Sequence, residues 1–329
     1  MTLRIGVIGV GRIGRMHARM IARETPRACL SAVADAHAAV SEEVAAELGV
    51  PALDVDGVID ASDAIAIATA TDTHVDLIVR AAEAGKAIFC EKPVSLDLAA
   101  VDRAADAVER AGVPFMVGFN RRFDPDHQAV REAVVAGRLG DVRLARVTSR
   151  DPSPPPIDYV RVSGGIWVDM MIHDFDMAAY VVGSPVVRVW AQGEVLIDPQ
   201  IGEAGDVDVG VAVLTHATGA ITTIDVSREA PYGYDQRVEV LGSLGMAISD
   251  NERLNTTEIY LAHVTERPVL PNFFIERYDL AYHRMWRAFV DYVLDGGPSP
   301  ASMEDGRAPV VIAEAAAESA RTGVPVSLR

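Results

Sequence analysis

A carboxylate and an imidazole four residues apart are the pair in this chain best suited to move a proton. Asp169 and His173 lie in the segment GGIWVDMMIHD, residues 164–174. On a helix, side chains four positions apart share one face, and a carboxylate there orients the imidazole or favours its charged form. The pair predicts general-base chemistry near neutral pH, although a structural helix histidine would give the same pattern. Two such ligands are too few for a metal ion, so we predict no metal site.

A lysine at the end of a predicted strand is the second candidate. Only Lys86 and Lys92 of the 30 basic residues are lysine, and the others are arginine. A position that keeps lysine against this bias indicates a need for a compact ammonium, a point donor whose pKa is easily tuned. Lys92 follows the predicted strand 87–90, at the edge where doubly wound sheets bind ligands. Lys86 precedes that strand in a predicted loop, where we expect a solvated charge.

A glycine-rich turn near the N-terminus predicts a dinucleotide site. The sequence GVGRIG stands between a predicted strand and a predicted helix, where the backbone can approach a pyrophosphate and the helix N-terminus supplies N–H donors. Asp35 follows this turn at the end of the second strand, where a carboxylate meets the ribose 2′-hydroxyl and repels a 2′-phosphate. We therefore predict NAD as the cofactor in preference to NADP. The turn residues expected to border it are Gly9, Gly11, Arg12, Ile13 and Gly14.

The first 120 residues read as strands alternating with helices. Such alternation predicts a parallel sheet with helices on both faces, the doubly wound Rossmann arrangement of an α/β domain. We therefore expect an NAD-binding Rossmann domain over residues 1–120. The predicted strands are 3–9, 30–34, 58–59, 64–68, 87–90 and 114–118, and the predicted helices are 12–23, 41–48, 74–84 and 97–111.

The remainder of the chain has a different pattern. Runs of alternating strands separated by turn residues predict a large, open, mostly antiparallel sheet, and consecutive prolines place a loop at 151–156. We expect an α+β domain over residues 121–329 that binds substrate and mediates oligomerisation. The predicted strands are 142–150, 186–196, 207–215, 220–228, 236–241, 246–249 and 257–262, and the predicted helices lie at 165–182, 275–295 and 303–321.

Composition argues against several classes of protein. The 329 residues carry a formal net charge of −17, which repels nucleic acids and anionic membranes. Two cysteines, Cys29 and Cys90, provide neither a disulfide framework nor a zinc cluster. No apolar run approaches the ~20 residues of a membrane span, and the N-terminus reads as a strand instead of a signal peptide. We expect a cytoplasmic protein that binds neither nucleic acid nor membrane.

Four sequence blocks resemble the Gfo/Idh/MocA family of oxidoreductases, and the resemblance spans essentially the whole chain. The blocks are the glycine turn at 9–14, EKP at 91–93, GFNRRFD at 118–124 and DMMIH at 169–173. Within that family the chain is most similar to the inositol 2-dehydrogenases. The segments that carry this closer similarity are RDPSPPPIDY at 150–159 and GGIWVDMMIHDFDM at 164–177.

The resemblance implies NAD-dependent oxidation of a secondary hydroxyl on a cyclic polyol, such as an inositol, to a ketone. In the implied mechanism His173 takes the hydroxyl proton, Lys92 hydrogen-bonds the same oxygen, and Asp169 orients His173. Polyol hydroxyls both donate and accept hydrogen bonds, so a pocket with several charged groups suits them. The implied substrate residues are Lys92, Arg121, Asp158, Asp169, His173, and Tyr232 or Tyr234.

The resemblance also implies further cofactor contacts. The loop after strand 64–68 would border the nicotinamide, with Ala70 at a position where many relatives have proline. The further cofactor residues implied are Thr69, Thr71, His74, Glu91 and Lys92.

Three other readings of the same residues stay open. One is oxidation of another sugar or sugar acid, and one is glycoside cleavage through a transient oxidation by NAD, which would release no net NADH. The third is a nucleotide sensor without turnover, but a sensor would have no need of the lysine, aspartate and histidine set.

The predicted open sheet indicates an oligomer. Three helices, at 165–182, 275–295 and 303–321, can cover about one face of such a sheet. Apolar residues alternate along its strands at Val209, Val211 and Val213, and again over 221–226. An apolar face of that size exceeds what soluble monomers leave uncovered, so we expect a homo-oligomer, most consistent with a tetramer.

Overall fold

The computed structural model describes residues 1–328, which divide into two compact units. Unit 1 consists of residues 1–120 and 282–308, and unit 2 consists of residues 121–281 and the segment from 309 onward. The first division therefore falls at the position where the sequence pattern changes. The later division differs from the predicted one, since a stretch near the C-terminus returns to unit 1.

Aromatic packing explains why residues 282–308 belong to unit 1. The ring of Trp286 lies 4.6 Å from the ring of Phe89, and Phe289 packs edge-on against the same Phe89. All three side chains are fully buried. The expectation of one uninterrupted second domain over 121–329 was wrong for this stretch, because a helix pattern does not reveal which core the helix packs against.

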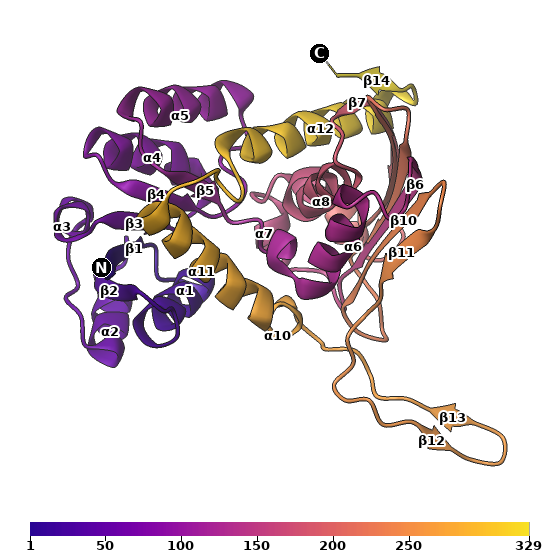
Figure 1. The fold of residues 1–329 in the computed structure, drawn as a ribbon, viewed down its shortest axis with the longest axis horizontal. Helices are drawn as coiled ribbons and strands as arrows, with labels where there is room; N and C mark the ends of the chain where they lie inside the picture. The colour runs from indigo at the N-terminus through magenta and orange to yellow at the C-terminus, as the bar shows by residue number, and fades with distance from the viewer. Residues whose placement is uncertain (329) are drawn as a thin grey trace. The chain divides into compact units, whose positions relative to one another are not determined.

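Unit 1 is built on a five-stranded parallel sheet in the order β2-β1-β3-β4-β5, with helices packed around it (Figure 1). The prediction of a doubly wound Rossmann sheet is confirmed. Its strands are β1 Leu3–Ile8, β2 Ala28–Ala34, β3 Ala64–Ile67, β4 Ala87–Cys90 and β5 Phe115–Val117. Its first five helices are α1 Arg12–Arg23, α2 Ala38–Leu48, α3 Val55–Ala61, α4 His74–Glu83 and α5 Leu98–Ala111.

One predicted strand of this unit is a helix. Residues 58–59 lie in α3 instead of forming a short buried strand. Asp54 caps α3, because its side chain accepts a hydrogen bond from the N–H of Gly57 at 2.8 Å. Two adjacent buried apolar residues fit a helix as well as a strand, and here the Asp54 cap favours the helix.

Unit 2 contains a seven-stranded sheet in the order β11-β10-β6-β9-β8-β7-β14. The prediction of a mostly antiparallel sheet is confirmed, with β6 and β9 as a parallel pair. Its strands are β6 Val142–Arg150, β7 Val186–Glu194, β8 Val209–His216, β9 Ile221–Ser227, β10 Asp235–Gly242, β11 Met246–Ser249 and β14 Val326–Ser327. Its helices include α6 Pro125–Val135, α7 Ile157–Val160, α8 Ile172–Val182, α9 Pro199–Glu203 and α12 Met303–Thr322, of which α12 begins in unit 1.

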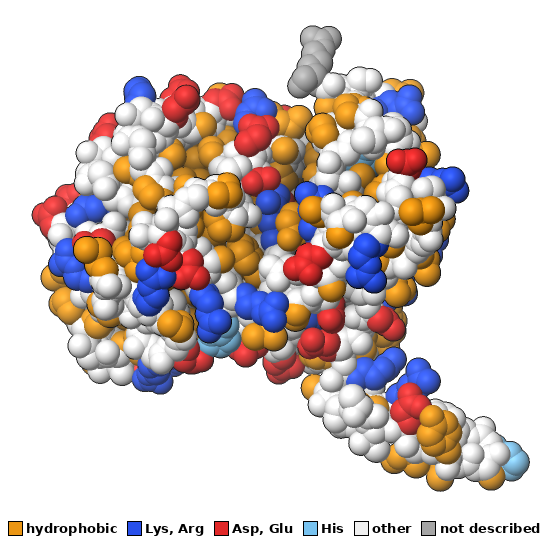
Figure 2. Space-filling view, viewed as in Figure 1, with side chains coloured by type: hydrophobic (Ala, Val, Ile, Leu, Met, Phe, Trp, Pro, Cys, Tyr) orange, Lys and Arg blue, Asp and Glu red, His pale blue; other side chains and the backbone are white. Residues whose placement is uncertain are grey.

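The predicted strand 257–262 does not join this sheet. Its residues form β12, Ile259–Tyr260, which pairs only with β13, Thr265–Glu266, in a hairpin that extends away from the sheet (Figure 1). The hairpin carries exposed hydrophobic side chains, as Figure 2 shows. An alternating pattern identifies a strand but does not state which sheet it joins.

The helices on the sheet also differ from the expected three. On one face of the seven-stranded sheet, buried side chains of the strands pack against α8, α6 and the later part of α12. The predicted helix 275–295 is divided into α10, Phe274–Arg277, and α11, Asp279–Asp295, and most of α11 belongs to unit 1. Helix α6, which was not predicted, packs on the sheet where helix 275–295 was expected. Asp124 caps α6 by accepting hydrogen bonds from the N–H groups of Asp126 and His127.

The opposite face of the sheet has no helix core of its own among the described residues. Leu144, Val211, Ile221, Met246 and Ile248 are exposed on it. The predicted alternation along β8 is confirmed. On β9, however, only the odd-numbered residues face outward, since Ile224 and Val226 are buried in the helix-covered core.

Candidate active site

Two of the three glycines in the turn between β1 and α1 are required by close backbone contacts, and the third borders open space. Gly9 has φ +86°, and a Cβ there would lie 2.7 Å from the Ala68 backbone. A Cβ on Gly14 would lie 1.8 Å from the carbonyl oxygen of Gly9, so α1 approaches β1 only because position 14 lacks a side chain. A Cβ on Gly11 would meet nothing within 4 Å. That open space lies at the N-terminus of α1, where a pyrophosphate fits.

Asp35 follows β2 and its carboxylate supports the glycine turn. The N–H of Val10 donates to Oδ2 at 2.8 Å, and the N–H of His37 donates to Oδ1 at 2.9 Å. A carboxylate has about four acceptor positions, so these bonds leave room for a ribose hydroxyl. The arrangement fits both a structural role in the turn and the predicted preference for NAD.

The loop after β3 is tied down by a buried histidine. His74 is fully buried, and its ring nitrogens lie 2.9 Å from the Pro93 carbonyl oxygen and 3.2 Å from that of Thr69. Burial lowers the pKa of His74. His74 therefore connects the loop to the segment after β4, while Thr69 and Thr71 remain partly exposed.

Lys92 follows β4, as predicted, and a chain of hydrogen bonds fixes the residue before it. The indole N–H of Trp286 donates to Nδ1 of His17 at 3.0 Å. Because that nitrogen accepts, Nε2 of His17 carries the proton and donates to Oε1 of Glu91 at 2.7 Å. Oε2 of Glu91 accepts the backbone N–H of Lys92 at 3.2 Å. The backbone that presents Lys92 is thus held from the interior of unit 1.

The other lysine has a structural contact. Nζ of Lys86 donates to the carbonyl oxygen of Ser62 at 2.7 Å. Lys86 is half-buried. The expectation of a merely solvated charge was wrong, because a backbone carbonyl lies within reach of its long side chain.

Asp169 and His173 lie on two successive helical pieces. Asp169 belongs to the π-helical turn Ile166–Met170, and His173 lies in the first turn of α8. The single helix predicted over 165–182 is therefore interrupted, and π-helical turns occur frequently at functional sites. The hydroxyl of Tyr159 donates to Oδ1 of Asp169 at 2.8 Å, and Nη1 of Arg228 lies 3.6 Å from Oδ2. The Asp169 carboxylate is thus held on both oxygens.

Arg121, predicted to line a polyol pocket, has its guanidinium engaged inside unit 2. Nη1 donates to Oδ1 of Asp174 at 2.6 Å, and Nη2 donates to Oγ of Ser149 at 3.2 Å. The side chain is only 6% exposed. Burial raises the pKa of Asp174 to about 6, against the opposing effect of Arg121. Arg121 therefore anchors α8 within unit 2.

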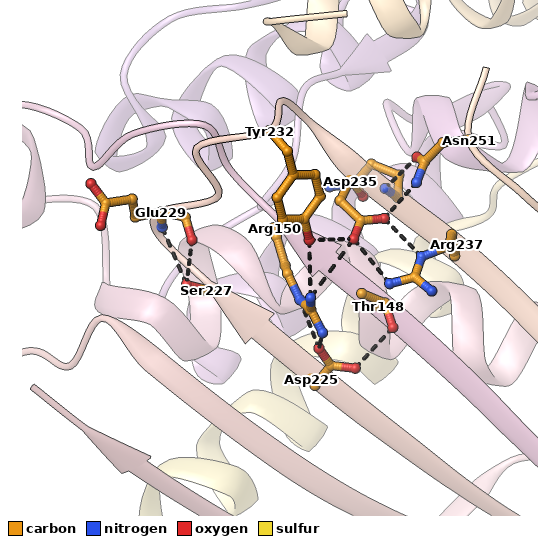
Figure 3. A network of polar contacts seen from close by, with 10 residues as sticks. Thr148, Arg150, Asp225, Ser227, Glu229, Tyr232, Asp235, Arg237 and Asn251 are labelled. Carbon is orange, nitrogen blue, oxygen red and sulfur yellow. Dashed lines mark hydrogen bonds and ion pairs between the residues drawn. The ribbon is translucent and has the colours of Figure 1, made fainter. Parts of the chain in front are cut away.

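The two predicted tyrosines differ in their surroundings. Tyr232 donates to Asp235 at 2.7 Å and accepts from Arg150 at 3.0 Å, within a polar network that includes residues of the sheet (Figure 3). Tyr234 is 6% exposed and packs edge-on against Tyr278. Burial raises the pKa of Tyr234, and the nearby charge of Arg121 opposes that rise. Tyr234 therefore lies close enough to Arg121 to feel its charge, whereas Tyr232 contacts Asp235 and Arg150.

Several polar residues at this site were not predicted. Asp151 follows β6, and burial raises its pKa to about 6, with Arg121 and Arg228 opposing the rise. Asp151 and Tyr159 both lie in the segment 150–159 that carries the resemblance, so a signal was present for them. Arg228 had none, since one arginine among so many is not distinctive. The predicted Asp158 is an exposed residue of α7.

No group of three or more His, Cys, Asp or Glu side chains among residues 1–328 is arranged to hold a metal ion. Over the same residues, no helix is both long enough and apolar enough to cross a membrane.

Family models match both parts of the chain. The model described as an oxidoreductase family with an NAD-binding Rossmann fold matches residues 3–119. The model for the GFO/IDH/MocA C-terminal domain matches residues 127–248. Together they cover most of unit 1 and of the seven-stranded sheet.

Full-length relatives give a consistent picture. A curated protein of Rhizobium meliloti named inositol 2-dehydrogenase is 46% identical over 97% of this chain and 97% of its own. The crystal structure of a myo-inositol dehydrogenase from Corynebacterium glutamicum is 40% identical, with a TM-score of 0.95 over 100% of this chain and 99% of that one. A scyllo-inositol dehydrogenase from Lactobacillus casei, with bound NAD(H) and scyllo-inositol, is 29% identical, with a TM-score of 0.92 over 99% of each chain.

The glycine turn yields a matched pair of substitutions. Gly14→Ala places a methyl group on the Gly9 carbonyl, so we expect it to lower the free energy of unfolding by more than about 2 kcal/mol. Gly11→Ala has space, so we expect a stability change below about 1 kcal/mol together with at least about tenfold weaker NAD binding. Denaturant unfolding and calorimetric titration measure the two effects. Normal NAD affinity in a folded Gly11→Ala protein would contradict the assignment of the turn.

Proposed function

The chain belongs to the Gfo/Idh/MocA family of NAD-dependent oxidoreductases, and from this premise we propose that it oxidises a secondary hydroxyl of an inositol to the ketone. The observation that carries the proposal is the full-length similarity to relatives named inositol 2-dehydrogenase. We further propose that the enzyme serves inositol catabolism in the cytoplasm. Its two cysteines, Cys29 and Cys90, are both free, which agrees with a reducing compartment.

The proposed chemistry assigns one task to each of three side chains. His173 takes the proton of the reacting hydroxyl as the carbonyl forms, which is the work of a general base. Lys92 donates a hydrogen bond to the same oxygen and stabilises its developing negative charge. Asp169 orients His173, and its own fixed position supports that role. NAD, when bound to the glycine turn, supplies the acceptor for the hydride that leaves carbon.

The surrounding polar residues would bind the remaining hydroxyls of the ring. Tyr234 and Asp151 are better candidates than Tyr232, because the hydroxyl of Tyr232 is engaged with Asp235 and Arg150. A protonatable Asp151 can donate as well as accept, which suits a hydroxyl-rich ligand. Arg121 contributes through Asp174 and α8, since its guanidinium is buried.

Initial rates test this proposal. Purified protein with NAD should form NADH steadily with one or more inositols, faster than with aldoses or sugar acids. His173→Ala should lower turnover about 10²–10⁴-fold while NAD binding stays near normal. Faster turnover of a sugar than of any inositol would contradict the proposed substrate. Glycoside cleavage without net NADH release would contradict the proposed reaction.

The two lysines of the chain provide a matched test of the proposed oxygen contact. Lys92→Arg should lower kcat by at least about tenfold, because a planar guanidinium does not reproduce a compact ammonium at the reacting oxygen. Lys86→Arg is the control, since arginine can still donate to the Ser62 carbonyl. Equal activity of the two variants in the NADH assay would remove Lys92 from the mechanism.

We also propose that the enzyme is a homo-oligomer, most consistent with a tetramer, that buries the open face of the seven-stranded sheet. Light scattering should then give a mass of about four times the 35.2 kDa chain. Val211→Arg places a charge on that face and should lower the mass. Val135→Arg, at an exposed position on α6, should leave it unchanged. A wild-type mass near 35.2 kDa would refute the proposal.

A further inference from the structure

A fully buried arginine contacts the carboxylate to which we assign the orienting role. Arg228 follows β9, its side chain is 1% exposed, and Nη1 lies 3.6 Å from Oδ2 of Asp169. Asp169 itself is 14% exposed. At such burial a charged group requires a partner, so the Arg228–Asp169 contact constrains both side chains.

Arg228 is positioned independently of Asp169. Nη2 of Arg228 donates to Oδ2 of Asp206 at 3.1 Å, a shorter contact than the one with Asp169. The backbone N–H of Arg228 donates to the carbonyl oxygen of Asp208 at 2.8 Å. The carboxylate of Asp208 in turn accepts three backbone N–H groups, from residues 196–198. The guanidinium is therefore held through Nη2 by Asp206, and its Nη1 faces the carboxylate of Asp169.

The same anchor also grips the turn that carries Asp169. Oδ1 of Asp206 accepts the N–H of Ile166, the first residue of the π-helical turn, at 2.9 Å. A Cβ on Gly165 would lie 2.7 Å from that oxygen, and Gly165 has φ +74°. Only glycine permits this approach without strain. Asp206 and Arg228 thus form one bracket, which holds the turn at its start and the Asp169 carboxylate at its side.

The bracket leaves Asp169 little rotational freedom. Tyr159 donates to Oδ1, and Arg228 lies against Oδ2, so both oxygens are restrained from opposite elements. The guanidinium at 3.6 Å also attracts the carboxylate and so restrains its direction further. Asp151 adds negative charge nearby, which Arg228 helps to offset. A carboxylate of fixed direction is what an orienting partner of an imidazole needs.

We propose that Arg228 is a positioning residue for the oxidation reaction, acting through Asp169 from its anchor on Asp206. The inference rests on the proposed function, since it assumes that Asp169 orients His173. Arg228 touches neither the reacting atoms nor the cofactor in this role. Its effect should therefore appear in kcat and disappear once Asp169 no longer carries a charge.

A double-mutant cycle tests this coupling. Arg228→Lys keeps a buried cation but cannot bridge two carboxylates, so kcat with NAD and inositol should fall about tenfold while KM for NAD changes less than about twofold. Arg228→Gln should lower kcat further than Arg228→Lys does, because the glutamine side chain carries no positive charge. In an Asp169→Asn background, Arg228→Lys should lower kcat by less than about twofold. If Arg228→Gln does not fold, Arg228→Lys completes the cycle alone.

Arg122→Lys provides the matched control. Arg122 is also buried in unit 2, and it pairs with Asp176 through two guanidinium nitrogens. This variant should lower the thermal midpoint yet leave kcat within about twofold of wild type. A purely structural role for Arg228 would give the same result as this control.

The outcomes separate the inference from the proposed function. A full tenfold loss from Arg228→Lys in the Asp169→Asn background would show that Arg228 acts apart from Asp169 and would overturn the inference. Unchanged kcat in both Arg228→Lys and Arg228→Gln would also overturn the inference. Near-normal kcat in Asp169→Asn alone would instead reject the role proposed for Asp169, and the inference would fall with it.

Discussion

The need to neutralise buried positive charge organises unit 2. An isolated buried ion costs several kcal/mol, so each buried arginine must find a carboxylate. The pairs that result are Arg121–Asp174, Arg122–Asp176, Arg277–Asp124 and Arg228–Asp206. The first two pairs fasten α8 to the segment after residue 120, and the last holds the π-helical turn. The position of Asp169 within the unit follows from the last of these contacts.

Unit 1 depends on a different constraint, the close approach of backbone to backbone. Helix α1 packs onto β1 because Gly14 lies against the carbonyl of Gly9 without a side chain between them. On the same helix His17 receives the Trp286 N–H and passes a hydrogen bond to Glu91. The helix to whose N-terminus we assign the pyrophosphate therefore also helps to hold the segment that carries Lys92.

The two faces of the large sheet serve different ends. One face packs against α6, α8 and α12 and so supports the residues to which we assign chemistry. The other face exposes apolar side chains and carries the polar network of Arg150, Asp225 and the buried Asp235 (Figure 3). This is the face to which we assign the proposed contact between subunits.

The sequence by itself determined the features that depend on local chemistry. Glycine spacing and hydrophobic periodicity were enough to predict the Rossmann sheet and the mostly antiparallel second sheet, and the shortage of lysine made Lys92 a candidate. Asp169 and His173 became candidates through their four-residue spacing together with the family resemblance. Tertiary structure decided whatever depends on partners distant in the chain. It placed residues 282–308 in unit 1 through the contact of Trp286 with Phe89. It also brought Arg228 into contact with Asp169. A buried charge pairs with whichever opposite charge lies nearby in space, and no local sequence pattern predicts that pairing.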